Sequence, residues 1–212
     1  MAVRKKGSAT RTRLIEAACD VFAEKGYDDA TVAEICARAD ANIAALNYHM
    51  GDKALAYRHA YQLAFAEGLS RHPFDFESDA SPLERLEAHI ISLLRRMNVD
   101  GDLTRFERIR NWESLKPTGL VDDLDHEVRK ESRAHMLKCL SDLVGGTASQ
   151  EELLLAEALV LSMCRMVLPF NKHELALVED RKIDEAMLEK LTRYILDLLQ
   201  GGLQFAIDRA SA

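Results

Sequence analysis

Side chains that could carry acid–base, nucleophilic or metal chemistry occur in this sequence but are scattered along it. The chain has seven histidines and four cysteines, and the only conceivable catalytic set is Glu113, His126, His135 and Cys139. No motif places a nucleophile beside a base and an orienting group, and no glycine-rich phosphate loop occurs. The histidines lack a metal-binding spacing such as H-E-x-x-H, and the cysteines form no C-x-x-C pair. We therefore expect no enzyme activity, no metal site and no bound cofactor.

The spacing that does predict a function lies in the first quarter of the chain and indicates contact with DNA. A helix that starts at Thr31 is expected to stop before Asp40, and a second short helix should follow with Asn42 as its N-cap. Two short helices joined by three or four residues can pack at a steep angle, so that the second lies in a major groove. Small side chains at Ala44 and Ala45 would let this second helix approach base edges closely.

The charge distribution is compatible with such a role. The net charge is −7, but residues 1–60 carry nine Lys or Arg against eight Asp or Glu, so the acidity belongs to the rest of the chain. An acidic body turned away from the duplex would help to orient a DNA-binding head. The basic residues at the N-terminus allow two interpretations, a solvated tail or an arm that contacts phosphates or the minor groove.

The elements that position these residues are predicted to be helices. Only four prolines occur, none of them in the first 72 residues, and no segment shows sustained alternation of β-branched residues. We expect an all-α fold of about nine helices, with capping boxes at Thr31–Glu34, Ser81–Glu84 and Ser149–Glu152. The predicted regions are a helix-turn-helix domain at 1–52, a connecting helix at 53–72, and a ligand-binding and dimerisation domain at 73–212.

The helix-turn-helix segment TVAEICARADANIAALNYHMGDKALAY, residues 31–57, resembles the DNA-binding domain of the TetR family. The preceding L-I-E-A-A at 14–18 and F-A-E-K-G-Y at 22–27 are part of the same resemblance. Three further stretches look like the CecR (YbiH-like) subgroup: N-I-A-A at 42–45, Y-H-M-G-D-K at 48–53 and E-S-L-K-P-T at 113–118.

The resemblance implies a role in DNA binding for nine residues. Thr31 and Lys53 would contact phosphates, Tyr48 and His49 the backbone or nearby bases, and Asn42, Ile43, Ala44, Ala45 and Asn47 would face the groove, while Leu46 and Met50 are core. Two other interpretations stand, that Tyr48 packs against the fourth helix and that His49 is simply solvated.

The family's usual turn glycine is Asp40 here, which tolerates a left-handed conformation, and its frequent tyrosine is Asn47, which could read adenine. Lys53 starts a helix, where the macrodipole disfavours a cation, so a phosphate explains it better than helix stability does.

Two apolar stretches near the C-terminus predict a dimer. Residues 153–170 are apolar nearly all the way round, so such a helix needs cover on both sides. The last helix, about 184–207, carries two apolar stripes: Met187, Leu191, Tyr194 and Leu198 on one, and Leu188, Ile195, Leu199 and Ala206 on the other. Two such helices from each of two subunits would form a four-helix bundle with two-fold symmetry.

A ligand cavity is expected between about Leu103 and Phe170. The candidate lining residues are Phe106, Ile109, Trp112, Glu113, Met136, Cys139, Met163, Met166 and Phe170. Methionines and aromatic residues at helical spacing are also ordinary core fillers, and that alternative stays open. Trp112 is the first candidate because a large amphipathic ring suits a pocket wall, and Glu113 could orient a polar ligand.

The resemblance implies a ligand-responsive transcriptional regulator, by expectation a repressor that binds palindromic operator DNA as a homodimer and is released by a small-molecule effector. The alternatives are a ligand-binding or adaptor dimer that does not bind DNA and, last, a helical enzyme. No apolar run is long and uncharged enough to span a bilayer, and four widely separated cysteines without a C-x-x-C pair fit a reducing compartment, so a cytoplasmic location is expected.

Overall fold

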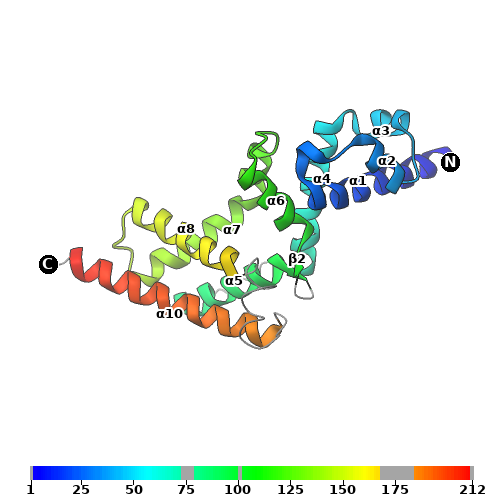
Figure 1. Ribbon diagram of the computed structural model, residues 1–212. Helices are drawn as coiled ribbons and strands as arrows, with labels where there is room; N and C mark the ends of the chain where they lie inside the picture. The colour runs from blue at the N-terminus through cyan, green and yellow to red at the C-terminus, as the bar shows by residue number, and fades with distance from the viewer. Residues whose placement is uncertain (1, 73–78, 100–101, 168–183, 211–212) are drawn as a thin grey trace, which may run out of the picture. The chain divides into compact units, whose positions relative to one another are not determined.

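The structure is a computed structural model that describes residues 2–72, 79–99, 102–167 and 184–210. Its helices in these ranges are α1 (Ala2–Asp29), α2 (Val32–Arg38), α3 (Ile43–Met50), α4 (Lys53–Arg71), α5 (Pro82–Met97), α6 (Arg105–Leu115), α7 (Asp122–Leu143), α8 (Gln150–Val167) and α10 (Glu185–Ala210) (Figure 1). A short antiparallel hairpin pairs β1 (Asn98–Val99) with β2 (Asp102–Leu103). The all-α prediction is confirmed. None of the helices in the described ranges combines the length and the apolar character that crossing a bilayer requires.

The chain forms two compact units, each built from two separate segments. The N-terminal unit contains Met1–Ser70 and Thr104–Val128, and the C-terminal unit contains Arg71–Leu103 and Arg129–Ala212. The segment Thr104–Val128, which the sequence boundaries place within 73–212, therefore packs with the helix-turn-helix. The physical reason is that α6 lies against α1 and adds apolar side chains to the same core.

The core of the N-terminal unit follows from the spacing of apolar residues on α1. Leu14, Ala18, Val21 and Phe22 recur every three or four residues, so they share one helix face, and all four are fully buried. The face packs against apolar side chains of α2, α3 and α4. α1 is broken at Gly26, whose φ of 74° and ψ of −173° lie outside the helical region.

Helix starts in the C-terminal unit are fixed by the predicted capping boxes. The Glu84 backbone N–H donates to Ser81 Oγ (3.3 Å), while Glu84 Oε2 accepts the Ser81 backbone N–H (2.8 Å). Ser149 and Glu152 make the same reciprocal pair, at 3.3 Å and 2.8 Å. Each pair satisfies amides that lack intrahelical partners, which is why α5 and α8 begin there.

In the C-terminal unit, α10 runs along α5 and α8 (Figure 1). One predicted stripe of α10 enters the core, since Leu188, Ile195 and Leu199 are at most 6% exposed. The other stripe is divided, because Met187 and Leu191 pack against the core whereas Tyr194 and Leu198 are 56% and 67% exposed. Only Tyr194 and Leu198 of that stripe are therefore open to solvent in a single chain, and the side chain of Ala206 lies outside the described residues.

Candidate DNA-binding surface and the helix behind it

The turn between α2 and α3 closes in a Schellman motif. The Ala41 backbone N–H donates to the Cys36 carbonyl (3.0 Å), and the Asp40 N–H donates to the Ala37 carbonyl (3.3 Å). This pattern needs a left-handed residue after the helix end, a position that glycine usually fills. Asp40 adopts it with φ of 47°, so the predicted tolerance of aspartate for this conformation is confirmed.

The first turns of α2 and α3 are capped by the side chains that the sequence nominates. Asn42 Oδ1 accepts the Ala45 backbone N–H (2.8 Å), and Thr31 Oγ1 accepts the Glu34 N–H (3.2 Å). In a complete capping box the Glu34 carboxylate would also accept the Thr31 backbone N–H. Here the Glu34 carboxylate pairs with Lys25 instead (2.8 Å). The helix α3, which is the predicted recognition helix because it would lie in the major groove, thus begins at Ile43 with its N-cap in place.

The recognition helix α3 has one buried face and one open face. Leu46 and Met50 are 0% and 2% exposed and hold the helix on the core, as expected. Ile43 is 54% and Tyr48 85% exposed. The Tyr48 ring contacts His49 edge-on, with centroids 4.9 Å apart, so burial against α4 is not its role. The open face also contains Ala44 and Asn47, with Asn42 preceding it, while Ala45 and His49 are partly exposed.

Lys53, the predicted phosphate ligand, has partners inside its own unit. Its Nζ donates to the Asp28 carbonyl (3.3 Å) and lies 4.5 Å from the centroid of the Tyr27 ring. A carbonyl and an aromatic face both attract a cation, so they offset the unfavourable start of a helix. The sequence reasoning missed this support. The side chain is only partly buried.

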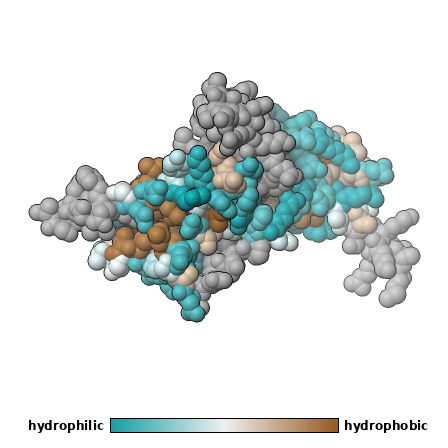
Figure 2. Space-filling model, turned by 90° about the horizontal axis from the view of Figure 1, so that it is seen from below, coloured by the Kyte–Doolittle hydropathy of each residue, from teal (hydrophilic) through white to brown (hydrophobic). Residues whose placement is uncertain are grey.

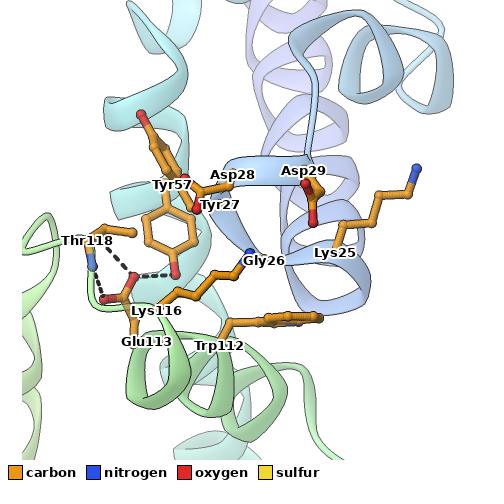
Figure 3. Close-up of a pocket in the computed structure, with 10 residues that line it drawn as sticks. All are labelled: Lys25, Gly26, Tyr27, Asp28, Asp29, Tyr57, Trp112, Glu113, Lys116 and Thr118. Atoms are coloured by element: carbon orange, nitrogen blue, oxygen red, sulfur yellow. Dashed lines mark hydrogen bonds between the residues drawn. The ribbon is translucent and has the colours of Figure 1, made fainter.

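Behind this surface, two adjacent residues of α6 join α1 to α4 (Figure 3). Trp112 Nε1 donates to the Ala23 carbonyl (3.3 Å), which lies next to the break of α1 at Gly26. The Trp112 ring covers Gly26 so closely that a Cβ there would lie 2.9 Å from Cδ2. The indole therefore caps the broken end of α1.

Glu113 is the neighbouring anchor. Its carboxylate accepts hydrogen bonds from Tyr57 Oη of α4 (2.6 Å), from Thr118 Oγ1 (2.8 Å) and from the Thr118 backbone N–H (3.0 Å) (Figure 3). Tyr57 is fully buried, and its burial together with the bond to Glu113 raises the pKa of its phenol. The E-S-L-K-P-T stretch thus fixes the loop after α6 onto α4.

Two hollows of very different size lie beside these anchors. A cavity of about 10 Å³ is lined in part by Trp112 and Glu113, and it has room for about one water molecule (Figure 3). Next to it lies an open groove of about 340 Å³, lined by Tyr27, Asp28, Lys116, Pro117, Thr118 and Leu120. Pockets for drug-sized ligands usually measure ~300–1,000 Å³.

The predicted ligand-lining residues are distributed over both units. Phe106, Ile109, Trp112 and Glu113 belong to the N-terminal unit, where Phe106 and Ile109 are core. Met136 and Cys139 are buried in the core of the C-terminal unit, and Met163 packs against it. The side chain of Met166 and all of Phe170 lie outside the described residues. Their role as a shared ligand cavity stays a prediction.

A buried polar cluster in the C-terminal unit was not foreseen as a cluster. His89 of α5 is 2% exposed, and its Nδ1 lies 3.1 Å from His135 Nδ1 of α7, while its Nε2 lies 3.4 Å from Ser132 Oγ. Burial, with a smaller contribution from His135, lowers the pKa of His89 to about 3. Cys139 Sγ lies 3.6 Å from the His135 ring nitrogens. Within the described ranges no three His, Cys, Asp or Glu side chains are placed to hold a metal ion.

Two family models match the chain. Residues 14–54 match the model for bacterial regulatory proteins of the TetR family, and residues 82–203, more than half of the chain, match the C-terminal domain of the HTH-type transcriptional dual regulator CecR. No curated protein matches significantly.

Solved structures agree in fold. A transcriptional regulator from Rhodococcus sp. Rha1 is 21% identical, with 91% of this chain and 96% of that chain covered and a TM-score of 0.60. A TetR-like regulator from Rhodococcus sp. RHA1 gives 20% identity, coverage of 92% and 96%, and a TM-score of 0.59. Salmonella enterica GusR is 16% identical, with 90% of this chain and 95% of that chain covered and a TM-score of 0.60. The matched families consist of transcriptional regulators, not enzymes. This chain therefore belongs to the TetR family of bacterial regulatory proteins.

Proposed function

We propose that this protein is a repressor of the CecR type that binds palindromic operator DNA as a homodimer and releases it when a small-molecule effector binds. The observation that carries the DNA-binding role is the α3 helix, held by two buried anchors and open on the opposite face, with Asn47 on that face. The match of residues 82–203 supports the subgroup. The proposed place of action is the cytoplasm, where operator DNA would be reached.

Selection from random duplex DNA, followed by footprinting, tests this function directly. A regulator should protect an inverted repeat whose half-sites are about one helical turn apart or somewhat more. The protein should also bind this repeat more tightly than it binds random duplex DNA. An adaptor dimer that has lost DNA binding would select no preferred sequence from the random duplexes. Native mass spectrometry of the purified protein would identify a retained effector, and adding that compound should release the DNA.

Substitutions at Lys53 and Asn47 should have different effects on DNA binding. Lys53→Ala should weaken all sequences alike and reduce the salt slope by about one unit, because one phosphate contact is lost. Asn47→Ala should relax the preference at one base pair by ~1–3 kcal/mol and leave the salt slope unchanged. Titrations against the selected duplex and its single-base variants measure both. If Lys53→Ala altered the preferred sequence but not the slope, the two assignments would be wrong.

The dimer surface is proposed on α8 and α10. Each helix exposes an apolar pair one turn apart: Leu155 and Leu159 (59% and 61%), and Tyr194 and Leu198. Hydrophobic surface is visible over this part of the molecule in Figure 2. Such unpartnered apolar stripes usually mark an interface between proteins.

Negative charges in the exposed apolar pair of α8 should break the dimer. Leu155→Glu with Leu159→Glu would bury unpaired carboxylates, so we expect the dimer dissociation constant to rise by at least ~100-fold. Sedimentation measures this dissociation constant. Leu115→Glu is the matched control, because Leu115 is 76% exposed but lies on α6. A double variant that stays as dimeric as the Leu115 control would place the interface elsewhere.

A further inference from the structure

One arginine of α1 reaches the turn that precedes the recognition helix. Arg13 Nε donates to the Ala39 carbonyl (3.0 Å), and its Nη2 donates to the Asp40 carbonyl (3.4 Å). The backbone of α1 is fixed at this point, since the next residue, Leu14, is fully buried. The guanidinium thus links the anchored first helix to the end of α2.

Arg13 contacts two backbone carbonyls that the hydrogen bonds of the α2–α3 turn do not use. The two Schellman bonds use the carbonyls of Cys36 and Ala37, whereas those of Ala39 and Asp40 lie beyond the last helical turn. A cation at this place also interacts favourably with the C-terminal end of the α2 dipole. Aspartate tolerates the φ of 47° at Asp40, but glycine adopts such a conformation more readily, so the turn keeps a conformational cost relative to glycine.

We propose that Arg13 is a positioning residue for DNA recognition, which keeps the α2–α3 turn formed and so presents α3 in its binding geometry. The inference rests on the proposed DNA-binding function. When only a fraction of the molecules has the competent turn, the apparent dissociation constant rises in inverse proportion to that fraction. Arg13 therefore raises affinity without touching DNA.

The first test compares Arg13→Gln with Arg11→Gln, which removes the same charge from the same helix. The ligand is a duplex that the wild-type protein selects from a random pool. We expect Arg13→Gln to weaken binding about five- to tenfold and to keep the salt slope of the wild type. This is less than buried charge-assisted hydrogen bonds are worth, because the Arg13 side chain is exposed. A slope lower by about one unit would show a direct phosphate contact and overturn the proposal, as would wild-type affinity.

The second test asks whether glycine at the turn replaces Arg13. In the Arg13→Gln background, Asp40→Gly lowers the conformational cost of the left-handed turn and should recover at least half of the lost affinity on a logarithmic scale. Asp40→Asn is the control for the lost carboxylate and should recover less. An equal recovery, or none, would contradict an effect through the turn.

The third measurement does not depend on DNA. Hydrogen exchange of the Asp40 and Ala41 amides reports the two Schellman bonds, so it should be faster in Arg13→Gln than in Arg11→Gln. Equal exchange in the two variants would overturn the positioning role even if the protein binds an operator. Faster exchange in a protein that selects no duplex would instead remove the proposed function and leave the structural link established.

Discussion

Gly26→Ala is expected to lower the free energy of unfolding by about 3 kcal/mol or more. The backbone of Gly26, with φ of 74° and ψ of −173°, costs a side-chain-bearing residue ~1–3 kcal/mol. The added Cβ would also lie 2.9 Å from Trp112 Cδ2, and overpacking of this kind typically costs a further ~1–3 kcal/mol. Urea denaturation measures the sum.

Gly119→Ala separates the two contributions. Gly119 has a φ of 69°, and a Cβ there would meet nothing within 4 Å, so only the conformational cost of ~1–2 kcal/mol is expected. Trp112→Leu should relieve the contact in a Gly26→Ala background, so that the double variant is more stable than the sum of the single effects predicts. Equal losses at the two glycines would show that the indole yields without cost.

Acid should destabilise the protein through His89. The folded chain keeps this imidazole neutral down to a pKa of about 3, whereas the unfolded chain takes up the proton near the ordinary value of 6.5. The unfolded state therefore binds more protons between these values, so stability is retained near pH 7 and lost as the pH falls. From pH 7 to pH 4 the loss is about 3 kcal/mol.

Comparison with His89→Gln isolates this effect from the carboxylates and from His135, whose pKa is also lowered by burial. The glutamine cannot titrate, so its variant should lose about 3 kcal/mol less than the parent between pH 7 and pH 4. His126→Gln is the control, because His126 is exposed on the same α7 that carries His135. Parallel pH curves for His89→Gln and the parent would show that His89 is protonated in the folded chain.

The sequence predicts those parts of the structure that depend on neighbours a few residues away. Asn42 as a cap, Asp40 in a left-handed turn, and the boxes at Ser81 and Ser149 each act over three or four residues, so their chemistry is visible in the sequence. The period of three to four on α1 and α10 likewise marks which faces are apolar.

Partners that are distant in sequence could not be predicted in the same way. Tyr57 and Glu113 are 56 positions apart and Trp112 and Ala23 are 89 apart, and no periodicity links them. The hydrogen bond of Trp112 to Ala23 and its contact with Gly26 are two such long-range contacts, while its place in a ligand cavity stays a prediction. The pairing of His89 with His135 depends in the same way on how α5 and α7 pack.

The interleaved make-up of the two compact units sets the order in which the protein can fold during synthesis. When the ribosome has translated Ser70, the helix-turn-helix still lacks Thr104–Val128, including the indole that caps α1. At ~5–20 residues per second, the roughly 60 residues up to Val128 take ~3–12 s. During that interval the nascent head exposes the apolar face that α6 later covers, so it is open to chaperones and proteases. A fragment cut at the end of α4 would remain in that state permanently.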